Sequence, residues 1–135
     1  FGLNNDAVNG EMVITHLALD RIESVKPADS PYIESEVDFG QYFDDVIGVT
    51  INPGDPIDIV LRFSPHRFNF VKTKPIHPYQ IEDEANHTLK LNVIPNKELE
   101  SLILSFGDDV EVISPENYRQ EIKRRIKEVI KKYDV

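Results

Sequence analysis

Arg21 carries the most distinctive chemistry in this sequence. It follows Asp20 directly, at the end of the alternating stretch V-I-T-H-L-A-L-D-R-I. A guanidinium group holds five donors in a planar fork that suits carboxylate or phosphate, and a neighbouring carboxylate can orient it. Two roles fit the pair. Arg21 is either an anion-binding residue at the rim of a small β-structure, or half of a structural Asp–Arg ion pair that braces the following turn.

A second polar group lies in the stretch H-P-Y-Q at residues 77–80. His77 and Gln80 stand at the entry to an expected strand, and Arg62 ends an earlier strand. One interpretation is a polar site that contacts a ligand or a partner chain. The other is a capped loop, in which His77 bonds the preceding K-T-K-P turn and Gln80 bonds the neighbouring strand.

Catalytic and metal-binding patterns are missing from the sequence. The chain has no cysteine, and its four histidines do not fall at metal-ligand spacings. Phosphate-binding glycine loops and nucleophile motifs are absent as well. Paired carboxylates occur only in polar turns and on helix faces, where nothing shifts their pKa toward catalysis. We therefore expect no catalytic residue, no metal and no cofactor, and hence no enzyme.

The charge is unevenly distributed along the chain. The net charge is −9, yet residues 116–135 carry seven basic and four acidic side chains. An acidic body repels DNA, so only the last helix could attract nucleic acid, and a solvated polar face explains that helix equally well. No apolar run approaches the roughly 20 residues that span a bilayer. With no cysteine and no secretory signal, we expect a cytoplasmic protein without membrane contact.

The first half of the chain must position Arg21. Residues 1–4 and 11–19 are predicted to form two strands joined through Asn9-Gly10, a pair suited to tight hairpin turns. Residues 27–55 read as a linker with one amphipathic helix at about 38–47, which Asp38 could cap. The predicted divisions are therefore 1–26, 27–55 and 56–135.

The second half has a regular order of elements. A strand from residue 56 leads to a helix capped by Ser64 with Pro65 at its first position. Two strands follow, then a helix opened by Asn96, a last strand, and a final helix that repeats the Ser-Pro start at Ser114. The fold class is α+β: a ferredoxin-like βαββαβ unit with an added C-terminal helix, preceded by a β-hairpin.

Several stretches in order resemble a known family of bacterial transcription regulators. L-A-L-D-R-I resembles the end of the WYL domain, a small Sm-like β-barrel. F-G-Q-Y-F-D-D-V-I-G-V, I-D-I-V-L-R-F, H-P-Y-Q, L-I-L-S-F-G-D-D-V-E-V-I-S-P and the final helix resemble WCX, the C-terminal extension that follows WYL. The resemblance covers nearly the whole chain, although the Trp-Tyr-Leu triplet that names the domain is absent.

The resemblance implies a sensing role for the first strands. Residues 1–26 would be the C-terminal remnant of the barrel, and residues 56–135 the WCX-type domain. Arg21 matches the family's basic residue that contacts a nucleotide, nucleic acid or other anionic effector, with Asp20 beside it. A second family arginine lies slightly upstream, where this chain has Thr15-His16, so His16 would partly replace it.

The resulting hypothesis is the effector-sensing and oligomerisation region of a WYL-type regulator. It would form a homodimer and meet DNA only through an N-terminal helix-turn-helix that precedes it. The start on Phe1 agrees with a piece of a longer chain. The alternative is a stand-alone small-molecule-binding regulatory module that uses the cleft of the ferredoxin-like unit with His77, Gln80 and Arg62.

Overall fold

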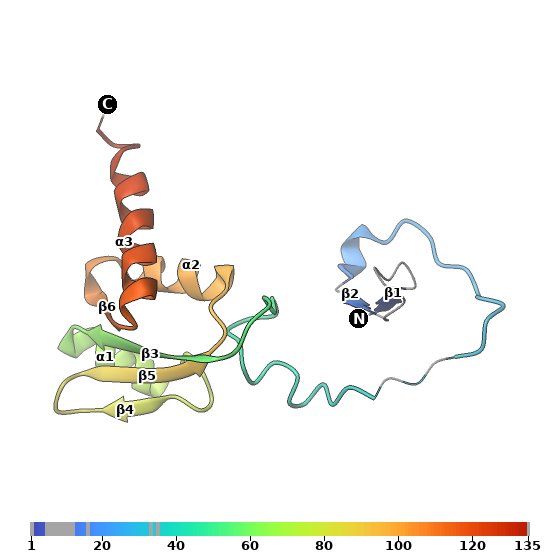
Figure 1. The fold of residues 1–135 in the computed structure, drawn as a ribbon, viewed down its shortest axis with the longest axis horizontal. Helices are drawn as coiled ribbons and strands as arrows, with labels where there is room; N and C mark the ends of the chain where they lie inside the picture. The colour runs from blue at the N-terminus through green and yellow to red at the C-terminus, as the bar shows by residue number, and fades with distance from the viewer. Residues whose placement is uncertain (1, 5–12, 16, 33, 35, 135) are drawn as a thin grey trace. The chain divides into compact units, whose positions relative to one another are not determined.

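The chain folds into two compact units, Phe1–Glu36 and Val37–Val135, in this computed structural model. The structure describes residues 2–4, 13–15, 17–32, 34 and 36–134. Each unit is considered by itself (Figure 1).

The first unit contains a short antiparallel strand pair. β1 (Gly2–Asn4) pairs with β2 (Val13–Thr15), with Leu3 opposite Ile14. The 3-10 turn η2 (Leu19–Arg21) follows, so the strand expected through residue 19 ends at Thr15. The predicted pairing is present, whereas the expected turn at Asn9-Gly10 lies outside the described residues.

The second unit is a mixed α+β structure. Its strands are β3 (Ile57–Phe63), β4 (Ile81–Asp83), β5 (Thr88–Val93) and β6 (Val110–Ser114). Its helices are α1 (Pro65–Thr73), α2 (Lys97–Ser105) and α3 (Glu116–Ile130), and the 3-10 turn η3 (Gly107–Asp109) precedes β6. The strands form one antiparallel sheet in the order β4-β5-β3-β6.

The core lies on one face of this sheet. Ile59 and Leu61 of β3 stand opposite Leu91 and Leu89 of β5, and all four side chains are fully buried. Because successive strand residues point to opposite faces, this alternation gives the sheet one apolar face. All three described helices of this unit add side chains to the same core: Phe68, Val71, Leu99, Ile103, Tyr118 and Ile122.

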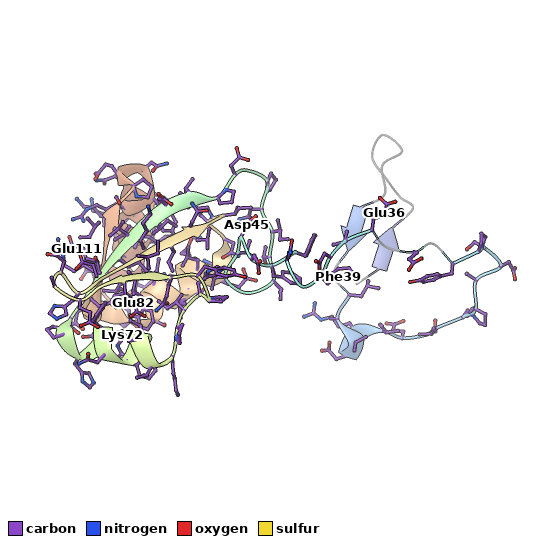
Figure 2. All side chains as sticks on the ribbon, turned by 90° about the horizontal axis from the view of Figure 1, so that it is seen from below. Glu36, Phe39, Asp45, Lys72, Glu82 and Glu111 are labelled. Carbon is purple, nitrogen blue, oxygen red and sulfur yellow. The ribbon has the colours of Figure 1, made fainter. Side chains whose placement is uncertain are left out.

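The opposite face of the sheet is polar and open. Lys90 pairs with Asp58 at 2.7 Å, and Asn92 Nδ2 donates to Asp58 Oδ1 at 2.8 Å. At the edge of the sheet, Figure 2 shows Lys72 of α1 beside Glu82 of β4. Asp58, Lys90 and Glu82 are exposed and Lys72 is half-buried, so these charges are hydrated and add little to stability.

Residues 38–47 do not form the predicted helix. Turns replace it, with Asp38 Oδ1 accepting a hydrogen bond from Gly40 N at 2.8 Å. Glycine inside the segment lowers helix propensity. The carbonyl of Asp45, which would lie in the last turn of such a helix, accepts from Ile94 N at 2.6 Å. The segment thus forms turns that this backbone bond ties to the end of β5.

Residues 37–55 are also closer to the core than a linker would be. Val46 is buried, and Ile47 packs against the core cluster. Gly48 has a φ of 78° and lies so close to Glu98 that a Cβ would come within 2.8 Å of its Cγ. Only glycine fits both the positive φ and this approach. The segment is part of the second unit.

The two Ser-Pro sequences behave differently. Ser64 caps α1, because its Oγ accepts from Arg67 N. The predicted repeat of this cap at Ser114 is wrong, since Ser114 is the last residue of β6 and the N-cap of α3 is Pro115, without a side-chain cap. Ser114 pairs with Val60 at a register shift, which keeps it in the sheet.

Candidate functional site

Arg21 and Asp20 lie in η2 and are both exposed. The backbone closes the turn through Arg21 N, which donates to Ala18 O at 3.0 Å. Neither side chain makes a hydrogen bond or an ion pair with any residue that the structure describes. Asp20 therefore does not brace the guanidinium here, and Arg21 can meet a ligand from outside. His16 falls outside the described residues.

His77 is buried in the turn between α1 and β4. Its exposed fraction is 4%, and its Nδ1 accepts from Tyr79 N at 3.3 Å. Its Nε2 is buried and has no hydrogen-bond partner within the described part of the chain. The ring lies 5.7 Å from the ring of Tyr79.

Gln80 ties the same turn to its neighbours. Its Oε1 accepts from Ile76 N at 2.9 Å, and its Nε2 donates to Val71 O at 3.1 Å and to Glu82 Oε1 at 2.9 Å. Gln80 N also donates to His77 O at 3.2 Å. His77 and Gln80 thus belong to one turn that joins the end of α1 to the edge strand.

Arg62 belongs to a different polar group. It lies on the open face of the sheet, where its guanidinium is 3.7 Å from Glu111. Among the described residues, no hydrogen bond or ion pair joins Arg62 to His77 or Gln80. Of the three residues predicted to form the secondary polar site, the structure therefore brings only His77 and Gln80 together.

A groove that sequence reasoning missed lies between α2, β6 and α3. Its volume is about 760 Å³. Its floor is apolar and comes from all three elements: Ile103, Leu104, Val110, Val112, Ile122 and Ile126. The signal in the sequence is the apolar stripe of α3, but only Tyr118 and Ile122 of that stripe are buried in the core.

The rim of the groove carries both charges. Glu111 is held by Arg119 at 2.8 Å as well as by Arg62. Lys123 and Lys127 line the α3 side, and Asp108 lines the opposite wall. The side chains of these last three make no hydrogen bond or ion pair within the described residues, so their charges are available to a partner.

Asp109 fixes the wall of the groove. Ser64 Oγ donates to its Oδ1 at 2.6 Å, and Arg67 Nε and Nη2 donate to its Oδ2 at 3.2 and 3.1 Å. These bonds from Ser64 and then Arg67 lower the pKa of the Asp109 carboxyl. The Arg67 guanidinium also stacks on Phe106, 5.5 Å from the ring centre. The start of α1 and the start of β6 are thereby joined.

Glu100 anchors α3 to α2. Its side chain is 9% exposed and is 2.5 Å from Lys97 Nζ and 2.9 Å from Arg125 Nε. Burial alone would raise the pKa of Glu100, but the bonds from Lys97 and Arg125 outweigh it, and the pKa is lowered. The neighbouring Tyr118 hydroxyl is buried, and this burial raises its pKa. The base of α3 is therefore fixed.

The described residues contain no group of three or more side chains that could hold a metal ion. Among the same residues, every helix is too short or too polar to cross a bilayer.

Comparison with known proteins identifies the second unit. The sequence profile of the WCX domain matches residues 55–130, more than half of the chain. No curated protein matches the chain. The match covers β3 to α3, including both the His77–Gln80 turn and the groove. The chain therefore belongs to the WCX domain family, the C-terminal extension of WYL-domain regulators.

Proposed function

We propose that this chain is the effector-sensing and oligomerisation region of a WYL-type transcription regulator and that it has no catalytic role. The WCX match over residues 55–130 carries the proposal. The first unit supports it, because a strand pair followed by an exposed arginine agrees with the end of a WYL barrel. DNA would be bound by an N-terminal helix-turn-helix domain of the same protein, because this acidic chain repels phosphate.

The sensing mechanism requires two arrangements of a homodimer. An effector changes the balance between them only if it binds one arrangement more tightly than the other. The chain would transmit this difference by altering the spacing of the two DNA-binding domains, which must match two half-sites on the DNA. We also propose that β3 to β6 form a ferredoxin-like unit, which the element order and the strand order β4-β5-β3-β6 support.

Arg21 is the proposed contact for an anionic effector. Its side chain has no partner among the described residues, so no existing ion pair must break when a phosphate binds. A charge-assisted contact to phosphate contributes about 1.5–3 kcal/mol, which corresponds to roughly a 10- to 100-fold change in affinity.

The test uses the intact regulator and a fluorescent single-stranded oligonucleotide as the anionic probe. Arg21→Ala should weaken binding at least about tenfold by this estimate, measured by fluorescence anisotropy at fixed salt. Lys26→Ala is the matched control, since Lys26 is an exposed cation on the same segment. Equal losses in both variants would mean that only the general charge matters. Unchanged affinity in Arg21→Ala would remove Arg21 from the site.

A second candidate function is a small-molecule-binding module centred on His77. The buried Nε2 of His77, without a partner among the described residues, favours it. Because Nδ1 accepts from Tyr79 N, Nε2 carries the proton and can donate one further hydrogen bond. Gln80 and the more distant Arg62 would complete the site. His77→Gln should then abolish the effector response of the intact regulator while Arg21→Ala preserves it. The opposite pattern supports the first proposal.

A further inference from the structure

We propose that the groove between α2, β6 and α3 receives the C-terminal half of α3 from a second copy of this chain. Two such contacts, related by a two-fold axis, would form the dimer. This inference rests on the proposed oligomerisation role and names the surface that performs it.

The first observation is that half of α3 has no cover. At the base of the helix, Tyr118 and Ile122 are 5% exposed. Beyond them, Ile126 and Val129 are 45% exposed, and Ile130 is 50% exposed. Figure 1 shows this end of α3 projecting away from the rest of the second unit. A helix with a sustained apolar stripe normally buries it against another element.

The second observation is that the uncovered stripe and the groove are one surface. Ile126, Val129 and Ile130 line the groove together with Val110 and Val112 of β6. Each copy thus offers a projecting apolar helix and an apolar hollow beside it. A two-fold axis places the helix of each copy over the hollow of the other and uses the same surface twice.

The third observation is the charge pattern, which selects a second copy as the occupant. The end of α3 and the turn after it are basic through Lys127 and Lys132, since Lys131 is paired with Glu128, while the chain outside residues 116–135 holds twenty acidic and eight basic side chains. Asp108 stands on the far wall of the groove without a partner in the described part of the chain. We place the two-fold axis perpendicular to α3, so that the two helices run antiparallel and each basic end meets the wall that carries Asp108 in the other copy.

The same pattern disfavours an acidic amphipathic segment from another protein as the main occupant. Such a segment would meet Lys127 but would face the carboxylate of Asp108, which is unpaired within the described residues, while Glu111 is already paired with Arg119 and Arg62. A second copy brings cations to the acidic wall and apolar side chains to the floor. Both requirements are met by one helix.

The experiment measures the oligomeric state of the 135-residue chain by sedimentation over a wide concentration range. Wild-type chain should show a monomer–dimer equilibrium. Ile130→Glu should raise the dissociation constant at least about tenfold, because a charge would enter an apolar contact. Ile81→Glu is the matched control: Ile81 is exposed and apolar but lies on β4, outside the groove. Circular dichroism establishes that both variants remain folded.

A charge exchange makes the test more specific. Asp108→Lys and Lys127→Glu should each weaken the dimer, and the double variant should recover at least part of the loss, because the pair forms across the interface. A monomer at every concentration would overturn the inference, as would a dimer that Ile130→Glu leaves intact. Dissociation of the dimer by a second, monomeric protein or by an amphiphile would also overturn it, because either would then be the occupant of the groove.

The outcome is separable from that of the proposed function. If Ile130→Glu leaves the dimer unchanged, the groove is not the interface, but oligomerisation through another surface stands. The oligonucleotide assay with Arg21→Ala tests the sensing role independently. Dimerisation and effector binding can therefore fail one at a time.

Discussion

At the scale of single residues, the side chain of Asn96 joins two separate segments of the second unit. Its Oδ1 accepts from Leu99 N at 2.9 Å and caps α2, while its Nδ2 donates to Ile47 O and Thr50 O, both at 2.8 Å. The side chain is almost fully buried. One amide thus fixes the start of a helix and holds the turns that precede β3.

Asn96→Ala should destabilise the fold by about 2–3 kcal/mol. Loss of the cap costs about 1 kcal/mol, and each carbonyl left without its donor adds about as much. Urea unfolding followed by circular dichroism measures the change. Asn92→Ala is the control, because Asn92 is exposed and bonds only Asp58, so about 0.5 kcal/mol or less is expected. Similar losses in the two variants would contradict this account of Asn96.

The residue types predicted two of the three helix starts. Ser64 and Asn96 are capping residues that precede apolar patterns, and both cap as predicted. Ser114 has the same local sequence as Ser64, but the sheet holds its backbone. His77 and Gln80 lie in one hydrogen-bonded turn, but His77 bonds Tyr79 N rather than the K-T-K-P turn of the loop interpretation. The buried Nε2 of His77, without a partner among the described residues, depends on packing that a short sequence motif does not reveal.

At the scale of elements, the attachment of α3 decides what the groove can do. Glu100 of α2 holds Arg125, so the helix is fixed as far as this residue while its end projects. The sequence predicted α3 and its apolar stripe. It could not predict which part of the stripe the core covers, because that depends on how far the helix extends past β6.

Glu100→Gln should destabilise the second unit at neutral pH, by about 1–2 kcal/mol, because Arg125 would lose its buried partner. The pKa of Glu100 is lowered in the folded state, so the ionised form contributes stability above the ordinary value of 4.5, and this contribution is lost as pH falls through the lowered pKa. The difference between wild type and variant should therefore shrink in acid. Urea unfolding at neutral and acidic pH measures it.

Glu128→Gln serves as the control for this prediction. Glu128 pairs with Lys131 at 2.7 Å on the exposed side of α3, where water screens the charges. Its removal should leave stability nearly unchanged at both pH values. If the difference in unfolding free energy between wild type and Glu100→Gln stays constant with pH, the substitution acts through altered packing and not through the lost charge.

The segment at residues 38–47 shows why an apolar pattern alone misleads. Phe39 and Val46 lie at helical spacing, yet the segment forms turns, and Gly40 within it weakens a helix. The Asp45 carbonyl bonds Ile94 N, a residue distant in the sequence. Local propensity therefore gave the correct elements from β3 onward but could not foresee how residues 38–47 join the second unit.

At the scale of the whole molecule, the charge distribution and the WCX match support a regulatory role. The net charge of −9 opposes direct binding to DNA, and the basic end of α3 is the exception. The composition and the order of elements were readable from the sequence. The groove was not, because three separate elements build it and each is ordinary by itself.

The measurement that tests the central claim most directly is the binding of the intact gene product to the DNA upstream of its own gene. Fluorescence anisotropy at physiological salt should show sequence-dependent binding by the intact protein and none by the 135-residue chain alone. Binding by this chain without further domains, or no specific binding by the intact protein, would contradict the proposal that these residues form the regulatory end of a transcription regulator.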